Sequence, residues 1–376
     1  MQDALRIIDA NFNRAREAMR VMEEYVRFCL DDAALTYACK TLRHDLVNVI
    51  CSLQLRIETG TLAGGDHPPT QKGVATHDCE NVLVAARDTV GDVGTGITCR
   101  GEKDRRDVVD VALAGFKRAS EALRSIEEYG KLIDSKVAAR VEQLRYETYK
   151  LERLFALTVR ARARFAKVRL YVLITEAFCK NDWFETSRLA LEHGADCIQL
   201  REKNLPDAEL LRRARRLARL CRDAGKLLVI NDRPDIALAS GAHGVHLGQD
   251  DMDVTSARRI LPPHIFVGLS THTEKQVDAA IGQAPDYIAV GPMFSSETKS
   301  QDRIAGYDVL ARARGKTALP LAAIGGLNAS RAGEVIARAD CFVCVCSSII
   351  SHSDVVSATE DLRAAIDAAW QLREDG

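Results

Sequence analysis

The stretch from Cys197 to Lys299 decides the fold. It contains the segments CIQLREK (197 to 203), VINDRPDIA (229 to 237), GVHLGQDD (244 to 251), VGLSTHT (267 to 273) and VGPMFSSETK (290 to 299). Each segment begins as a short apolar run and ends abruptly in polar residues. Short apolar runs without alternation are typical of strands that are buried on both faces. Segments of helical periodicity, such as 206 to 224, separate them. The stretch therefore predicts repeated strand and helix units around a parallel sheet.

Counting these units outward from the stretch predicts an α/β protein with a (β/α)8 TIM barrel. The expected strands cover residues 169–175, 197–200, 227–230, 244–247, 265–269, 287–290, 319–324 and 341–346, and a last helix covers 355–372. In such a barrel the chemistry lies on the loops that follow the strands. The polar residues gather after strands two to six. Charges that merely solvate a surface would also spread over the helices, so this grouping favours a functional site.

Composition limits the class of protein. The chain has 376 residues, which is enough for two domains, and its net charge of −1 argues against bulk attraction to nucleic acid or to an anionic membrane. Its 11 cysteines form no disulfide framework, and the run DCFVCVC (340 to 346) is interpreted as a buried strand, not a zinc site. Because no long apolar segment occurs, we expect a cytoplasmic protein.

The first part of the chain contains an internal duplication. Residues 10–25 (ANFNRAREAMRVMEEY) match residues 114–129 (AGFKRASEALRSIEEY) at ten of sixteen positions, at an offset of 104. Apolar residues recur there three and four apart, which predicts amphipathic helices. A second helical segment follows each copy and carries TLRHDL (41 to 46) or QLRYET (143 to 148). The pattern predicts two related helical hairpins, in which Glu and Arg residues three and four apart form structural ion pairs.

The segment between the two copies differs from them in amino-acid composition. Residues 60–76 are rich in Gly, Pro and Thr and indicate a loop, and a glycine-rich turn follows at 91–96. Such a turn could cradle a phosphate through its backbone amides, but a turn between two short strands explains the spacing equally well. A basic run at 159–169 precedes the first barrel strand. We therefore expect a helical domain over residues 1–165 and the barrel over 166–376.

Residues 169–373 resemble thiamine-phosphate synthase. The motifs QLREK, NDR, HLGQ-x-D, the Ser of GLSTHT, the T-K after GP, and IGG at 324–326 occur in the order typical of that family. The resemblance implies that a pyrimidine diphosphate is joined to a thiazole phosphate, or to its carboxylate form, to give thiamine phosphate and pyrophosphate. One departure is Ser295-Ser296 in place of the usual Pro-Thr, which puts the order of that loop in question.

The resemblance also implies the roles of individual residues. Hard carboxylate oxygens suit Mg²⁺, so the expected metal ligands are Asp232 and Asp251. The groups expected to bind the pyrimidine diphosphate are Gln199, Arg201, Glu202, Lys203, Asn231, His246, Ser270 and Lys299. Of these, the expected catalytic residues are Arg201, Lys203, Ser270 and Lys299, with no general base, because the thiazole nitrogen attacks with its lone pair. The thiazole phosphate is expected to contact Ser296, Thr298, Gly326 and Ser347.

The first 165 residues are similar to a non-ribokinase type of hydroxymethylpyrimidine-phosphate kinase found fused to this synthase. The duplicated helix and the segment RDT-x-x-DVGT (87 to 95) carry this resemblance, which makes Arg87, Asp88, Asp92 and Thr95 candidate site residues. Two alternatives remain open: a thiazole tautomerase-like barrel, and a non-catalytic helical oligomerisation domain. The expected partners are small-molecule substrates and a second copy of the chain, without nucleic acid or membrane.

Overall fold

The computed structural model describes residues 1–59, 81–87, 104–295 and 304–375. The chain divides into two compact units, Met1–Ala156 and Leu157–Gly376. The division falls inside one long helix, α5 (Ser135–Phe165), which leaves the first unit and enters the second. The expected domain break at residue 166 coincides with the end of this helix, whereas the division by compactness lies before it.

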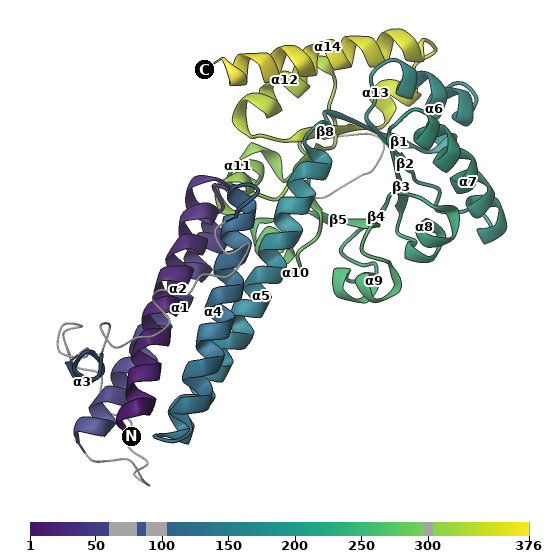
Figure 1. Ribbon diagram of the computed structural model, residues 1–376. Helices are drawn as coiled ribbons and strands as arrows, with labels where there is room; N and C mark the ends of the chain where they lie inside the picture. The colour runs from purple at the N-terminus through teal and green to yellow at the C-terminus, as the bar shows by residue number, and fades with distance from the viewer. Residues whose placement is uncertain (60–80, 88–103, 296–303, 376) are drawn as a thin grey trace. The chain divides into compact units, whose positions relative to one another are not determined.

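The first unit is helical. Its helices are α1 (Gln2–Phe28), α2 (Ala33–Glu58), the short α3 (Asn81–Ala85), α4 (Val108–Gly130) and the first part of α5. Aspartates begin three of them by accepting hydrogen bonds from backbone N–H groups of the first turn: Asp32 for α2, Asp107 for α4 and Asp134 for α5. Long helices joined by short turns form the two expected hairpins, α1 with α2 and α4 with α5 (Figure 1).

The duplication is visible in the packing of this unit. Residues 104 positions apart in α1 and α4 are buried together, for example Phe12 with Phe116 and Met19 with Leu123. Helices α1 and α4 pack against each other along their apolar faces, as the three-four spacing predicts. Phe155 of α5 joins this core, with its ring centroid 5.3 Å from that of Tyr25 and 5.2 Å from that of Phe116. The two hairpins are therefore halves of one core.

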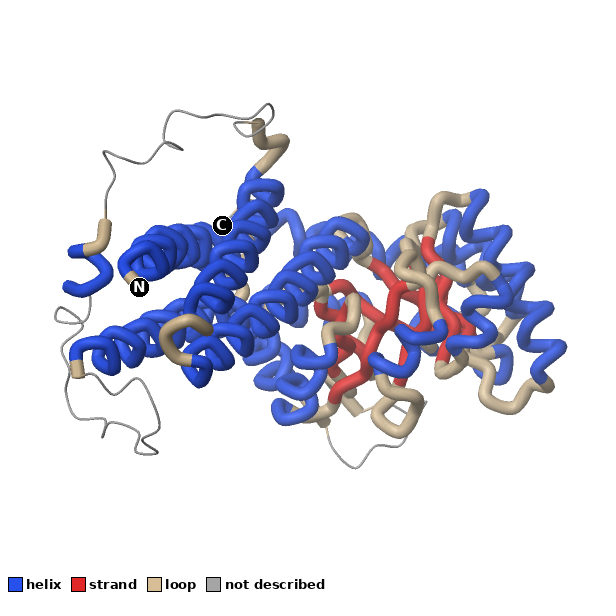
Figure 2. Tube along the Cα trace, turned by 60° about the horizontal axis from the view of Figure 1, so that its bottom comes forward, coloured by secondary structure: helices blue, strands red, loops and turns tan. Residues whose placement is uncertain are grey.

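The second unit is the predicted barrel. Eight parallel strands close in chain order, and the first strand pairs with the last. They are β1 (Leu170–Ile174), β2 (Cys197–Leu200), β3 (Leu227–Asn231), β4 (Gly244–Leu247), β5 (Phe266–Thr271), β6 (Tyr287–Val290), β7 (Leu321–Ile324) and β8 (Phe342–Val345). Each of the eight expected strands is present. Figure 2 shows these strands in red, with helices around them.

Helices cover the outside of the barrel. They are α6 (Trp183–Glu192), α7 (Asp207–Asp223), α8 (Pro234–Ser240), α9 (Val254–Ile260), α10 (Glu274–Gln283), α11 (Gly306–Lys316), α12 (Ala329–Arg338), α13 (Ser347–Ile350) and α14 (Val355–Glu374), with a 3-10 turn at Glu176–Phe178. Between strands and helices lies a continuous apolar layer, to which outward-facing residues such as Val172, Ile198 and Val267 contribute. Burial on both faces explains why these strands are apolar without alternation.

Aromatic rings fill the interior of the barrel. Phe165, at the end of α5, lies among Phe266, Tyr287 and Phe342, with ring centroids 5.0–5.5 Å from its own. Tyr171 stacks on Phe342 at 5.9 Å. Two of these rings lie where a neighbouring strand has glycine: Phe266 beside Gly244 and Tyr287 beside Gly268. This packing fixes the position of the two tyrosine hydroxyl groups inside the barrel.

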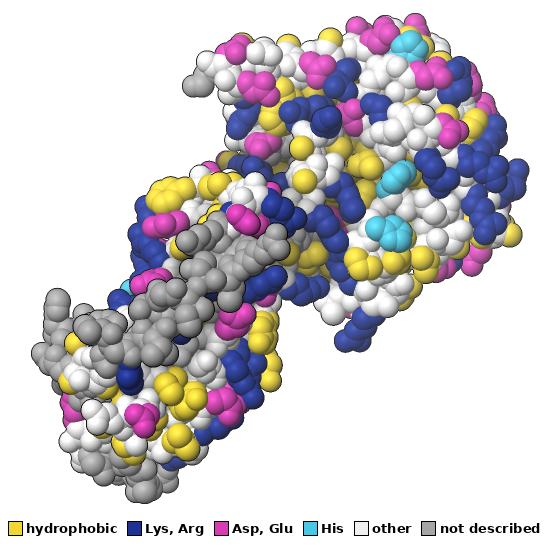
Figure 3. Space-filling view, in the orientation of Figure 1, with side chains coloured by type: hydrophobic (Ala, Val, Ile, Leu, Met, Phe, Trp, Pro, Cys, Tyr) yellow, Lys and Arg dark blue, Asp and Glu magenta, His cyan; other side chains and the backbone are white. Residues whose placement is uncertain are grey.

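The surface carries both signs of charge. On the face seen in Figure 3, Lys and Arg side chains are interspersed with Asp and Glu side chains, as expected for a chain of net charge −1. Among the described residues, the helices are too short or too polar to cross a membrane.

Candidate active site

The predicted site residues follow consecutive barrel strands. Gln199 lies near the end of β2 with Arg201, Glu202 and Lys203 after it, and Asn231 ends β3 with Asp232 after it. His246 lies in β4, Asp251 in the loop beyond it, and Ser270 near the end of β5. Because the strands are parallel and adjacent, their carboxyl ends meet at one end of the barrel. The structure therefore brings these residues to the same end.

A continuous chain of hydrogen bonds links Gln199 to Ser270 through the barrel interior. Gln199 Nε2 donates to the hydroxyl of Tyr171 at 2.7 Å, and that hydroxyl lies 3.1 Å from the hydroxyl of Tyr287. Tyr287 in turn contacts His246 Nδ1 at 2.8 Å, and His246 Nε2 contacts Ser270 Oγ at 2.8 Å. The first four side chains of this hydrogen-bonded series are buried, and its last member, Ser270, is partly exposed.

Burial determines the protonation state of the side chains in this hydrogen-bonded series. It lowers the pKa of His246 to about 4, so the imidazole is neutral at pH 7. It also raises the pKa of Tyr171 and of Tyr287 well above the usual value, so both phenols keep their protons. A neutral imidazole donates through one nitrogen and accepts through the other. His246 is therefore suited to transmit a hydrogen bond, and unsuited to supply positive charge.

Two carboxylates face each other beyond β3 and β4. Burial, followed by the hydrogen bond and the negative charge of Asp251, raises the pKa of Asp232. The only described cation that pairs with Asp232 is Lys203, with Nζ 3.5 Å from Oδ2. The loop holds Asp251 in place, because the N–H of Gly248 donates to its Oδ2 at 2.7 Å. Asp232 also has a positive φ of 62°, a conformation that costs free energy in a non-glycine residue.

This acidic pair fits a divalent cation. Paired carboxylates repel each other unless a positive charge lies between them, and Mg²⁺ commonly takes one or two carboxylates together with phosphate oxygens and water. The described residues contain no group of three or more His, Cys, Asp or Glu side chains placed to hold a metal. The remaining ligands of an Mg²⁺ ion would therefore come from water and from a phosphorylated substrate.

The residues after β2 are held by the neighbouring strand and helix. The carbonyl of Arg201 accepts a hydrogen bond from Thr175 at 2.9 Å, and Glu202 accepts one from the N–H of Glu176 at 2.7 Å. Burial raises the pKa of Glu202, although Arg213, 3.8 Å away, opposes the shift. The charge of Arg201 reaches Cys346 after β8, where it lowers a thiol pKa that burial raises. Arg201 thus places positive charge at this end of the barrel.

The expected thiazole-phosphate residues lie after β7 and β8. Gly326 has a φ of 62°, and a Cβ at this position would lie 2.7 Å from the carbonyl oxygen of Ser295, so the backbone approach requires glycine. Ser347 begins α13, which follows the neighbouring strand. The structure thus places Gly326 and Ser347 just after the adjacent strands β7 and β8. Ser296, Thr298 and Lys299 lie outside the described residues, and Ser295 is exposed at their edge.

A cavity of about 250 Å³ lies at the opposite end of the barrel. Its lining includes Val168 before β1, Leu321 at the start of β7 and Phe342 at the start of β8. The predicted site residues follow the strands instead. This cavity is therefore separate from the candidate site.

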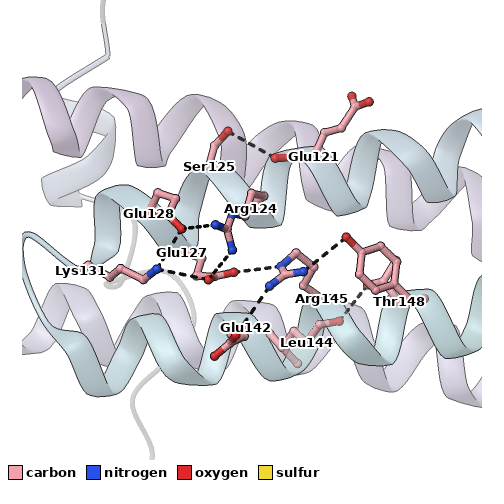
Figure 4. Close-up of polar contacts among 11 residues, drawn as sticks. Glu121, Arg124, Ser125, Glu127, Glu128, Lys131, Glu142, Leu144, Arg145 and Thr148 are labelled. Atoms are coloured by element: carbon pink, nitrogen blue, oxygen red, sulfur yellow. Dashed lines mark hydrogen bonds and ion pairs between the residues drawn. The ribbon is translucent and has the colours of Figure 1, made fainter.

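The helical unit contains two related ion-pair clusters. Figure 4 shows the second: Glu127, 2% exposed, lies between Arg124 of its own helix and Arg145 of α5, each with a nitrogen 2.9 Å from a carboxylate oxygen. In the first, Glu23 contacts Arg43 of α2 at 2.9 Å. The expected pairs of Arg20 with Glu24 and of Arg124 with Glu128 are present at 2.9 and 2.7 Å. The buried glutamates were not predicted, although Glu23 falls on the apolar stripe beside Met19 and Met22.

Among the candidate site residues of the helical unit, Arg87 pairs with a side chain of α1. Arg87 forms two hydrogen bonds with the buried Asp9, at 2.7 and 2.9 Å. The other candidates, Asp88, Asp92 and Thr95, lie outside the described residues. The position that corresponds to Asp9 in the second copy, 104 residues further on, is the apolar Leu113. This pair therefore distinguishes the first copy from the second.

Comparison with known proteins covers both units. A family model described as thiamine monophosphate synthase matches residues 170–349, and one described as the ThiD2 family matches residues 6–61 and 70–154. A thiamine-phosphate synthase of Rhodopirellula baltica is 36% identical over 376 residues, which cover 96% of this chain and 92% of that protein. Another, from Thermosynechococcus vestitus, is 38% identical over 358 residues, with 95% and 93% covered.

A solved structure matches the barrel. The thiamine phosphate pyrophosphorylase of Pyrococcus furiosus is 33% identical, with a TM-score of 0.51, and the match covers 54% of this chain and 97% of that one.

Proposed function

This chain belongs to the thiamine-phosphate synthase family, and from this premise we propose which of its residues perform the reaction. The barrel joins 4-amino-2-methyl-5-(diphosphooxymethyl)pyrimidine to 4-methyl-5-(2-phosphooxyethyl)thiazole and releases pyrophosphate. One observation carries the assignment of residues. The hydrogen-bonding side chains Gln199, His246 and Ser270 lie at the same barrel end as the acidic pair Asp232 and Asp251. An aminopyrimidine and its diphosphate need these two kinds of group side by side.

The pyrimidine is bound by the hydrogen-bonding set. Gln199 and Asn231 carry amides that both donate and accept, which suits the edge of an aminopyrimidine ring. Ser270 adds a hydroxyl, and the neutral His246 supports it at 2.8 Å. These groups orient the methylene carbon of the substrate toward the thiazole.

The reaction breaks one bond and forms another. The C–O bond to the diphosphate breaks with its electron pair going to the leaving oxygen, and the thiazole nitrogen forms the C–N bond with its lone pair. Since no proton is removed, the main task is to stabilise negative charge on the leaving group. Arg201, Lys203 and Lys299 supply fixed positive charge for this purpose. Ser296, Thr298, Gly326 and Ser347 hold the thiazole phosphate.

The acidic pair holds the metal in this proposal. Asp232 and Asp251 would bind Mg²⁺, which when bound neutralises charge on the diphosphate oxygens. The raised pKa of Asp232 supports this assignment, because the repulsion that contributes to it disappears when a cation lies between the carboxylates. The loop residue Gly248 keeps Asp251 oriented for the same purpose.

The test uses the full chain with both substrates and Mg²⁺. We expect thiamine phosphate and pyrophosphate, and we expect Asp251→Asn to lower kcat/KM by at least about a hundredfold, the scale of losing a charged group that acts on the leaving oxygens. Asp250→Asn is the matched control, because it removes the neighbouring exposed carboxylate. Absence of product from the folded chain would refute the synthase assignment. A normal rate in Asp251→Asn would refute only its metal role.

We further propose that the helical unit phosphorylates the pyrimidine monophosphate and so supplies the barrel with its diphosphate substrate. The match of the ThiD2 family model to both halves of this unit supports the proposal. The asymmetric pair of Asp9 and Arg87 also supports it, because a packing module of two equal halves would not need it in one copy alone.

The full chain, given ATP and pyrimidine monophosphate without thiazole phosphate, should accumulate the diphosphate. Arg87→Gln should reduce this rate while thiamine phosphate formation from supplied diphosphate continues. If no diphosphate forms, the helical unit is the oligomerisation module, and sedimentation of the full chain would measure the assembly. The tautomerase alternative is disfavoured, because relatives matching over both units bear the synthase name.

A further inference from the structure

The hydrogen bonds that link Gln199 to Ser270 constrain one another's direction. The three inner members of this series, Tyr171, Tyr287 and His246, can each donate one hydrogen bond and accept another along the chain. All three are neutral and buried. Buried polar groups of this kind lose free energy if a donor meets a donor. The bonds therefore all run in one direction.

In one direction, Gln199 Nε2 donates to Tyr171, Tyr171 to Tyr287, and Tyr287 to His246 Nδ1. His246 then carries its proton on Nε2 and donates to Ser270, whose own hydroxyl proton is left for the substrate. Gln199 meanwhile presents its Oε1, an acceptor. In the reverse direction the amide of Gln199 is turned over, so that its Oε1 accepts from Tyr171 and its N–H groups face the substrate. The other bonds reverse as well, and Ser270 presents a lone pair. In both cases one end donates to the substrate and the other accepts.

We propose that Tyr171 and Tyr287 are positioning residues that couple the hydrogen-bonding polarity of Gln199 to that of Ser270. The pocket consequently selects a pyrimidine edge with a donor at one end and an acceptor at the other. A 4-aminopyrimidine offers this pattern through its exocyclic N–H and its ring nitrogens. A 4-oxo analogue replaces the donor with an acceptor and moves a proton to the ring, so it mismatches a fixed polarity. This inference rests on the proposed function, since it concerns the same pyrimidine pocket.

The chain also explains why two large tyrosines occupy the barrel interior. A phenylalanine would fill the same space, and Phe165, Phe266 and Phe342 do so nearby. The hydroxyl of Tyr171 bridges β1 to Gln199 on β2, and that of Tyr287 bridges β6 to His246 on β4. Each tyrosine thus contributes a polar link that packing alone does not require.

The test compares Tyr171→Phe and Tyr287→Phe with the wild type on the 4-aminopyrimidine diphosphate and its 4-oxo analogue. Each variant keeps its ring and frees the amide of Gln199 to rotate. We expect kcat/KM for the amino substrate to fall about tenfold, the cost of one unsatisfied buried hydrogen bond, and kcat/KM for the oxo analogue to rise or stay constant. The double variant should be no worse than either single variant, because one break already uncouples the ends.

The matched control is Thr359→Val, which deletes a fully buried hydroxyl from α14, where it donates to the carbonyl of Val355. It should leave the ratio of the two kcat/KM values unchanged. If the tyrosine variants lower both kcat/KM values equally, the tyrosines only support packing and the proposal fails. Additive losses in the double variant would also overturn it. If the wild type makes no thiamine phosphate, the proposed function fails first, and the two failures are thereby distinguished.

A spectroscopic measurement tests the same coupling without turnover. Nitrogen-15 NMR of histidine-labelled enzyme, with the His246 signals assigned by their loss in His246→Gln, reports which ring nitrogen carries the proton. We expect a single tautomer in the wild type and a mixture in Tyr171→Phe, because the hydroxyl of Tyr171 is linked to the imidazole through that of Tyr287. An unchanged tautomer in Tyr171→Phe would refute the coupling.

Discussion

The ring of Tyr287 occupies the space that a side chain at residue 268 would need. A Cβ built on Gly268 would lie 2.1 Å from Cζ of Tyr287 and 2.5 Å from its hydroxyl oxygen. A separation this short is a steric clash, so only glycine allows the hydroxyl to reach His246. Gly244 has the same relation to Phe266, with a contact of 2.2 Å. Glycines in the strands therefore shape the interior on which the candidate site depends.

We therefore expect Gly268→Ala to disrupt the candidate site, although it adds only one methyl group. The methyl group would push the Tyr287 ring away and break its bond to His246, and overpacking of this kind costs about 1–3 kcal/mol. We expect a lower urea midpoint and a loss of synthase activity of at least about tenfold. Gly282→Ala in α10 is the control, because nothing lies within 4 Å of its added Cβ. Normal activity in Gly268→Ala would show that the position of Tyr287 is unimportant.

Asp232→Asn should stabilise the metal-free protein and inactivate it. Burial and the neighbouring Asp251 raise the pKa of Asp232 above its ordinary value of 3.8, so its ionised form costs stability at neutral pH. This cost shrinks as pH falls from the raised pKa toward 3.8. Removing the charge at pH 7 should therefore raise Tm, by roughly 1–3 °C. Mg²⁺ should raise Tm of the wild type only. If the variant melts earlier than the wild type without metal, the carboxylate repulsion is not a net cost.

His246 should make the folded state sensitive to acid. Burial lowers its pKa from 6.5 to about 4. Between these two pH values the unfolded chain binds a proton at His246, whereas the folded chain does not. The stability that this contributes is complete above pH 6.5 and is lost as pH falls toward 4, at up to about 1.4 kcal/mol per pH unit. When the free energy of unfolding in urea is plotted against pH between these values, the slope should be shallower for His246→Gln than for the wild type. The control His264→Gln removes an exposed histidine and should keep the slope of the wild type.

The barrel could be predicted from the sequence because strand burial and helix periodicity are local patterns. The β2, β4 and β6 strands have the expected bounds, and the remaining strands differ by one or two residues at their ends. The gathering of polar residues after consecutive strands was predictable for the same reason, since parallel order determines which ends meet. The division of the chain was harder to predict, because α5 is continuous across it and carries no break in its pattern.

The polar links across the barrel could not be predicted in this way. Tyr171 and Tyr287 lie in apolar strands, where a tyrosine looks like one more core residue, and their hydroxyl groups meet across 116 positions of sequence. The buried Glu127 was missed for a related reason. Residues three and four apart on a helix pair at the surface equally well, so spacing did not distinguish the exposed Glu128 from its buried neighbour.

That difference in burial leads to the last prediction. Glu127 is 2% exposed and is held by Arg145 of the partner helix, whose guanidinium also lies 4.7 Å from the ring centroid of Tyr146. Glu127→Ala removes the nearest counter-charge of a buried arginine, which keeps only the longer contact with Glu142 at 3.8 Å. We therefore expect a loss of about 3–5 kcal/mol in the free energy of unfolding, measured with urea.

Glu128→Ala is the control, because it removes the adjacent glutamate, which is 44% exposed, and should change stability little. The equivalent pair in the first copy makes a second comparison: Glu23→Ala should cost about as much as Glu127→Ala, since Arg43 approaches Glu23 at the same 2.9 Å as Arg145 approaches Glu127. Equal, small losses for Glu127→Ala and Glu128→Ala would mean that the buried pair adds nothing to holding α4 against α5. The hairpins would then depend on apolar packing alone.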